Sequence, residues 1–128
     1  MVVDHIGVAV SDLAESKVFF ARALAPLGIT MMAEDDGWVG FGRGELAAFW
    51  FGEDDTHPGP MHIAFSAESR LQVDQFHAAA LAAGAEDNGA PGVRPQYHAH
   101  YYGAFVVGPD GHNIEAVCHV PPPNHADG

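Results

Sequence analysis

The sequence predicts an α+β fold, in which two tandem βαβββ modules form curved mixed sheets around a cleft. The first observation is an internal repeat: MHIAFSA at 61–67 resembles DHIGVAV at 4–10, at an offset of 57 residues. The second is that each half shows a strand-like alternation, then apolar residues at helical spacing, then short apolar strand-like segments. The length of 128 residues corresponds to a single domain made of both modules.

The first module is predicted to occupy residues 1–52. Residues 2–10 carry alternating β-branched side chains, which predicts a strand. A helix is expected to start at Ser11 or Asp12, because Asp12 and Glu15 have the spacing of a capping box, and to end near Pro26. Three strands should follow at residues 29–33, 37–42 and 45–51, with a hairpin turn at Arg43-Gly44 between the last two.

The second module is predicted to occupy residues 61–119, after a linker at 53–60. Ser69 and Gln72 repeat the capping spacing, and Gly84 is expected to end the helix. The sequence GPDG at 108–111 is a strong turn signal between strands near 101–107 and 112–118. Residues 88–100 are interpreted as an insertion that the first module lacks. The proline-rich residues 120–128 should form an extended tail.

The charge balance excludes several classes of partner. Five Lys and Arg residues against 17 Asp and Glu give a net charge of −12, which argues against nucleic acid and membranes as partners. No apolar run has the length of a membrane span, and the N-terminal residues lack the basic segment of a signal peptide. The single cysteine, Cys118, excludes an intrachain disulfide. A cytoplasmic protein that binds a small-molecule substrate is therefore expected.

Strand alternation predicts which side chains face the cleft. Ile6 and Val8 are bulky and should face the helix, so His5 should face the other way. The same argument places His62 and Glu115 on the cleft face of their strands. Two imidazoles and a carboxylate would suit one divalent metal ion, Fe, Mn, Zn, Ni or Co. The alternative is that each is a polar residue satisfied by hydrogen bonds, without a metal.

Polar and aromatic residues are concentrated near the end of the predicted insertion. Such a loop could cover the cleft and supply groups that move protons or bind the substrate. It could equally be an ordered loop in which the aromatic residues serve packing alone. The residues concerned are Arg94, Tyr97, His98, His100, Tyr101 and Tyr102.

These motifs resemble those of the vicinal oxygen chelate superfamily, which includes glyoxalase I, extradiol dioxygenases, fosfomycin-resistance transferases and bleomycin-resistance proteins. The resemblance rests on DHIGVAVSDL at 4–13, HIAF at 62–65 and GPDGHNIE at 108–115, and it covers residues 1–119. It implies the glyoxalase/bleomycin-resistance/dioxygenase fold, a homodimer, and a divalent metal held by His5, His62 and Glu115. Matching Gly44 to Gly111 puts Ala48 at the place of a fourth family ligand, and alanine cannot coordinate a metal.

Two functions are compatible with this resemblance. The first is a metal-dependent enzyme that acts on a small oxygen-chelating substrate by lyase, isomerase or ring-cleaving dioxygenase chemistry. The second is a non-catalytic protein that sequesters a ligand, as bleomycin-resistance proteins do. In the enzyme, Tyr101, Tyr102 or His98 would move protons. Binding of the substrate is assigned to the remaining candidates, Trp50, Arg94, Tyr97 and His100.

Overall fold

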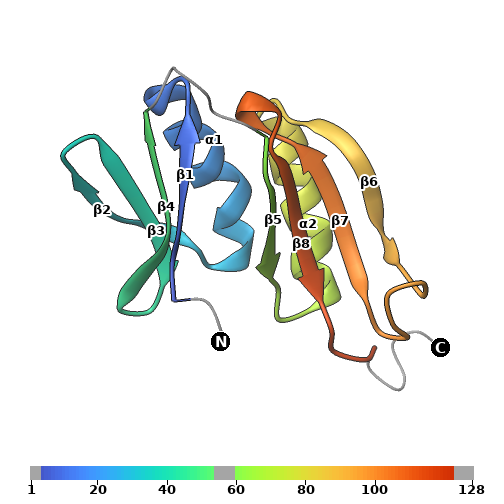
Figure 1. Ribbon diagram of the computed structural model, residues 1–128. Coiled ribbons are helices and arrows are strands. Elements are labelled where there is room, and N and C mark those ends of the chain that lie inside the picture. The colour runs from blue at the N-terminus through green and yellow to red at the C-terminus, as the bar shows by residue number, and fades with distance from the viewer. Residues whose placement is uncertain (1–3, 54–59, 123–128) are drawn as a thin grey trace.

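The computed structural model describes residues 4–53 and 60–122, which form two βαβββ modules (Figure 1). The first contains β1 (Ile6–Val10), α1 (Leu13–Leu24), the 3-10 turn η1 (Ala25–Leu27), β2 (Thr30–Asp35), β3 (Trp38–Arg43) and β4 (Leu46–Glu53). The second contains β5 (His62–Ser66), α2 (Arg70–Ala82), β6 (Glu86–Val93), β7 (Tyr102–Val107), the 3-10 turn η2 (Pro109–Gly111) and β8 (Asn113–Cys118). The predicted fold class is confirmed.

Each module contributes one four-stranded mixed sheet. The strand orders are β1-β4-β3-β2 and β5-β8-β7-β6, and the first pair in each sheet is parallel while the others are antiparallel. The two sheets therefore have the same topology, as the repeat in the sequence predicts. In each sheet the first strand of the module lies at the edge, and Figure 1 shows β1 and β5 facing each other across the gap between the sheets.

Both helices begin at the predicted capping residues. The carboxylate of Asp12 accepts a hydrogen bond from the Glu15 amide at 2.9 Å, and the hydroxyl of Ser69 accepts one from the Gln72 amide at 3.1 Å. These contacts satisfy amides of the first helical turn that have no partner within the helix. Gly28 and Gly84 follow the helices with φ of 75° and 104°, a backbone conformation that glycine adopts without strain.

One core joins the modules. Phe20 on α1 packs edge-to-face on Phe49 of β4, and Phe49 packs in the same way on Phe65 of β5, with ring centroids 4.9 and 5.0 Å apart. His112 is 1% exposed and links the two modules. Its Nδ1 accepts the Met61 amide at 2.9 Å, so its Nε2 carries the proton and donates to the Ala9 carbonyl at 3.2 Å.

The predicted insertion at 88–100 is wrong in part, because residues 88–93 belong to strand β6 and only the segment between Val93 and Tyr102 is a loop. The sequence here contains two glycines and Pro91, which normally interrupt strands. They are tolerated because β6 is an edge strand, and its pairing with β7 shifts register on both sides of Gly89. The predicted strand residues 2–3, most of the linker and the last six residues of the tail lie outside the described residues.

Candidate functional site

A groove of about 260 Å³ lies between the two sheets, where β1 and β5 face each other. We call it the inter-sheet groove. Two of the three predicted metal ligands, His5 and His62, line it from opposite walls. The repeat places them at corresponding positions of the two modules, at the start of the first strand in each sheet. The other lining residues are Asp4, Ile6, Ala48, Phe49, Ile63, Ala64 and Phe65.

The third predicted ligand, Glu115, is buried on β8 beside His62. Its side chain is 1% exposed, and its Oε1 lies 2.8 Å from Nε2 of His62, the side chain of which is 54% exposed. Its other oxygen accepts a hydrogen bond from the Tyr101 hydroxyl. A carboxylate can only accept hydrogen bonds, so His62 carries its proton on Nε2 in this arrangement. The structure thus brings His62, Glu115 and Tyr101 together.

Gly103 makes room for this cluster, and the sequence did not single it out. A Cβ atom at this position would lie 3.1 Å from Oε2 of Glu115 and 3.2 Å from Cε1 of Tyr101. Such distances are shorter than ordinary van der Waals contact, so a side chain here would push the two groups apart. Glycine inside a strand is a signal for such a close approach, and it could have marked this position in the sequence.

Tyr101 keeps its proton at neutral pH. Burial, followed by the hydrogen bond to Glu115, raises the pKa of its hydroxyl above the ordinary value for tyrosine. The ring lies 4.8 Å from that of Tyr97 and 5.4 Å from that of His98, measured between centroids. Tyr101 is therefore held in place from two sides as a hydrogen-bond donor that points at the Glu115 carboxylate.

Tyr102 points to the opposite face of the sheet. Its hydroxyl donates to Asp74 on α2 at 2.6 Å, and the Arg70 guanidinium lies 4.9 Å from its ring centroid. Burial and the bond to Asp74 raise the pKa of Tyr102 to about 12. The side chain is thus turned toward α2, because neighbouring residues of a strand face opposite sides. The structure does not bring Tyr102 to Glu115.

The other loop candidates lie around Tyr101 rather than against Glu115. Nε2 of His98 is 2.6 Å from Nδ1 of His119, and the two rings stack with Tyr101 at their edge. The His100 amide donates to Nδ1 of His98 at 3.2 Å. Arg94 lies over the ring of Phe105, whose centroid is 6.1 Å from that of His62, so its guanidinium is on the cleft side of β7. His119 was not predicted to belong to this group.

His5 stands apart from the other two predicted ligands. Its Nδ1 is 2.8 Å from the Asp4 carboxylate, and its side chain is 65% exposed. Within residues 4–53 and 60–122, no three His, Cys, Asp or Glu side chains are close enough together to hold a metal ion. The chemistry of the donors nevertheless fits one. Nε2 of His62 and Oε1 of Glu115 converge, and both could coordinate an ion that displaces the Nε2 proton, with the neutral imidazole then protonated on Nδ1. Asp4 leaves Nε2 of His5 free to coordinate.

The residue of the first module that corresponds to Glu115 is Trp50. The prediction that Ala48 occupies this position was therefore wrong. Ala64 pairs with Glu115, and Gly7, 57 residues before Ala64, pairs with Trp50. The match between the turn glycines is off by two residues. The extra residue of β4 at Ala48, where the pairing with β3 shifts register, accounts for one of them. The turns also differ in length, because Arg43 pairs with Leu46 whereas Val107 pairs with Asn113. The position that the resemblance gives to a fourth ligand therefore carries an indole, whose N–H cannot coordinate a metal.

A second pocket, of about 710 Å³, lies on the face of the first sheet that is turned away from α1. We call it the Trp pocket. Trp50, predicted to bind the substrate, lines it, and so does Trp38, which the sequence did not single out. His5 belongs both to this pocket and to the inter-sheet groove, so the two are adjacent. The remaining lining residues are Gly7, Asp35, Asp36 and Ala47.

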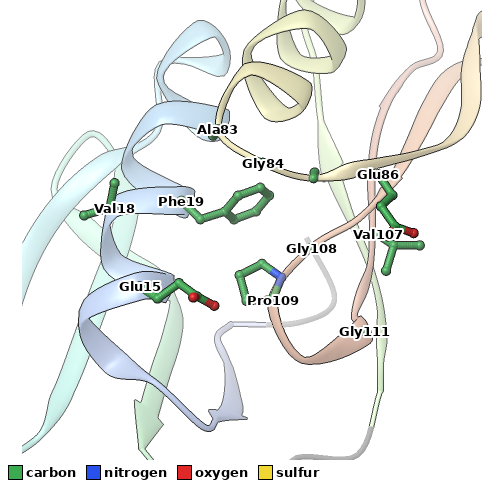
Figure 2. A pocket seen from close by; sticks show the side chains of 11 residues that line it. Glu15, Val18, Phe19, Ala83, Gly84, Glu86, Val107, Gly108, Pro109 and Gly111 are labelled. Carbon is green, nitrogen blue, oxygen red and sulfur yellow. The ribbon is translucent and has the colours of Figure 1, made fainter.

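A third hollow, of about 600 Å³, lies on the far side of the sheets, between α1, the end of α2 and the turn η2 (Figure 2). Phe19, Val107 and Pro109 form its apolar walls, and it contains none of the predicted site residues. Glu15 and Glu86 are its only ionisable lining residues. Of the predicted site residues, His5 and His62 line the inter-sheet groove, and His5 and Trp50 line the Trp pocket. None of the helices in the described segments has both the length and the apolar character required to cross a membrane.

Comparison with known proteins identifies the family. Residues 2–116 match the model of the Glyoxalase/Bleomycin resistance protein/Dioxygenase superfamily. The structure resembles a glyoxalase/bleomycin resistance protein from Albidiferax ferrireducens T118, with 29% identity, a TM-score of 0.77, and coverage of 92% of this chain and 99% of that one. No curated protein matches the chain.

Two further solved structures share the fold at lower identity. A glyoxalase/bleomycin resistance protein/dioxygenase family enzyme from Burkholderia phytofirmans PsJN is 17% identical, with a TM-score of 0.70 and coverage of 91% of this chain and 98% of that one. TioX from Micromonospora sp. ML1 is 13% identical, with a TM-score of 0.72 and coverage of 94% and 100%. At these identities the likeness concerns the fold alone.

Proposed function

Since the chain belongs to the glyoxalase/bleomycin resistance protein/dioxygenase superfamily, we propose that it is a metal-dependent enzyme acting on a small oxygen-chelating substrate. The reaction is of the lyase, isomerase or ring-cleaving dioxygenase type. His62, Glu115 and His5 hold one divalent ion, Fe, Mn, Zn, Ni or Co, at the inter-sheet groove. The ion, when bound, supplies Lewis-acid activation of neighbouring substrate oxygens.

The observation that carries this proposal is the Glu115 carboxylate. It is almost completely buried, yet its partners are His62 and Tyr101 rather than a Lys or Arg side chain. Burial of a carboxylate without a cation is costly, because the charge loses its hydration. A divalent cation beside His62 and Glu115 would offset that cost. The carboxylate is therefore better explained by a metal ligand than by a residue that only maintains the fold.

His5 completes the set from the other sheet. Asp4 accepts a hydrogen bond from Nδ1 of His5, which fixes the tautomer with an unprotonated Nε2. Carboxylates that orient a histidine in this way are common around metal ligands. Because His5 and His62 line the two walls of one groove, a metal bound between them would connect the modules.

Tyr101 is the residue proposed to move a proton. Its raised pKa keeps the hydroxyl protonated, and the hydroxyl lies beside the proposed ligand Glu115. A donor in this position can give its proton to an oxygen that gains negative charge during the reaction. Tyr97 and His98 pack on its ring and hold it in that orientation. Arg94, on the cleft side of β7, is proposed to bind a substrate oxygen.

Metal titration of the purified protein tests this function. We expect Mn²⁺ or Zn²⁺ to bind with a stoichiometry of one ion per chain in calorimetry, and His62→Ala to abolish binding. Glu86→Gln, which changes a glutamate of the distant hollow in Figure 2, serves as the control and should bind normally. Absence of binding by the unaltered protein would refute the proposal and favour the ligand-sequestering alternative.

A further inference from the structure

Both tryptophans of the chain lie on the cleft face of the first sheet, each flat against a glycine of a neighbouring strand. Trp38 pairs with Gly52, and a Cβ atom at 52 would lie 2.6 Å from Cδ2 of the indole. Trp50 pairs with Gly40, and a Cβ atom at 40 would lie 2.8 Å from its Cη2. Because Gly40 and Gly52 have no side chains, the two indole rings can pack flat against the sheet.

This packing fixes the two rings and leaves a surface for a ligand. An aromatic ring on a cross-strand glycine stabilises a sheet, and it also loses the freedom to rotate. Trp38 nevertheless remains 44% exposed. The outer faces of two immobilised indoles line an open pocket of about 710 Å³, which is large enough for a fused-ring molecule. A planar ligand can stack here with little ordering of the protein.

The charge around these rings is negative. Asp35 and Asp36 line the same pocket at the β2–β3 turn, and neither takes part in an ion pair among the described residues. No Lys or Arg lines the pocket; Arg94 lies on the other sheet, over Phe105. Indole faces and nearby carboxylates both attract cations.

We infer that the Trp pocket binds a planar aromatic cation, and that this is the class of substrate on which the enzyme acts. The inference rests on the proposed function, because it assigns the substrate for the same cleft. The cationic ring lies on Trp38 and Trp50 between the Asp35 and Asp36 carboxylates. The oxygens of the substrate extend past His5, which borders both the Trp pocket and the inter-sheet groove, toward His62 and Glu115.

The test compares N-methylquinolinium with quinoline, which has the same ring system but is neutral at mildly alkaline pH. Neither probe carries a chelating oxygen, so both are titrated into metal-free protein by calorimetry. Because the chain contains no tryptophan outside the pocket, quenching of tryptophan fluorescence reports binding at this site. We expect the cation to bind about tenfold more tightly than quinoline, and more weakly as salt is added.

Two variants separate the contribution of the aspartate charges to binding from that of the indole rings. Asp35→Asn combined with Asp36→Asn keeps the shape of the turn, since asparagine tolerates the positive φ of 50° at position 36. It should reduce the preference for the cation to about twofold or less, whereas Glu45→Gln, an exposed charge outside the pocket, should not. Trp38→Leu, followed by calorimetry, should weaken both probes. Circular dichroism establishes that each variant is folded.

Equal binding of the two probes, or an unchanged preference in the aspartate variant, would overturn the inference. Titration of Mn²⁺ into the same protein shows whether the inferred substrate class or the proposed metal site has failed. If Mn²⁺ binds and the cation shows no preference, the substrate class is wrong while the metal site stands. If the cation binds and no metal does, the proposed function fails, and with it the assignment of the cation as an enzyme substrate.

Discussion

Replacement of Glu115 by glutamine tests the site most directly, because it removes one charge and retains the shape of the side chain. Glu115 accepts two hydrogen bonds, from His62 and Tyr101. The amide of glutamine has a single acceptor oxygen, so one of the two donors would face an NH₂ group instead. A buried donor left without an acceptor costs about 1–3 kcal/mol.

This cost predicts a measurable loss of thermal stability in the metal-free protein. For a domain of this size, about 1 kcal/mol corresponds to roughly 4 °C, so Tm should fall by about 4–12 °C. Metal affinity should fall as well, by about tenfold or more, because the only charged ligand of the proposed site is lost. Scanning calorimetry measures the first effect, and titration with Mn²⁺ the second.

The two readouts separate the possible roles of Glu115. Glu45→Gln, in the exposed turn before β4, controls for the loss of one negative charge and should change neither quantity. A lower Tm with unchanged metal affinity would show that Glu115 maintains the structure and binds no metal. An unchanged Tm would refute the hydrogen-bonding scheme itself, because both donors would then be satisfied without the carboxylate.

Three further predictions follow from other contacts. His112→Leu should destabilise the protein by about 2–5 kcal/mol, because the Met61 amide and the Ala9 carbonyl lose a buried hydrogen-bond partner. Urea unfolding measures this loss, and a loss below the error of the measurement would contradict the bridging role of His112. Gly103→Ala should lower metal affinity, as measured by calorimetry, because the new methyl group would displace Glu115; unchanged affinity would show that the strand yields instead. Light scattering should report a homodimer, since pairing of two copies would cover the exposed sheet edges; a monomer at micromolar concentration would rule this out.

The sequence alone determined the architecture and several local structures. The repeat at an offset of 57 residues predicted two modules of the same topology, and both capping residues, Asp12 and Ser69, were identified from spacing. These predictions succeed because they depend on local patterns: a capping hydrogen bond spans three residues, and strand alternation has a period of two.

The tertiary structure decided the relations that depend on partners far away in the chain. A bulge at Ala48 shifts β4 against β3, so only the pairing with β1 shows that Trp50 corresponds to Glu115. The segment that forms β6 contains glycines and a proline, which predict a loop. It forms a strand because it lies at the edge of its sheet, where these residues are tolerated. Trp38 and Gly103 gain their roles only through contacts across strands, which are set by register. Register arises from packing of the whole sheet, and no local pattern in the sequence encodes it.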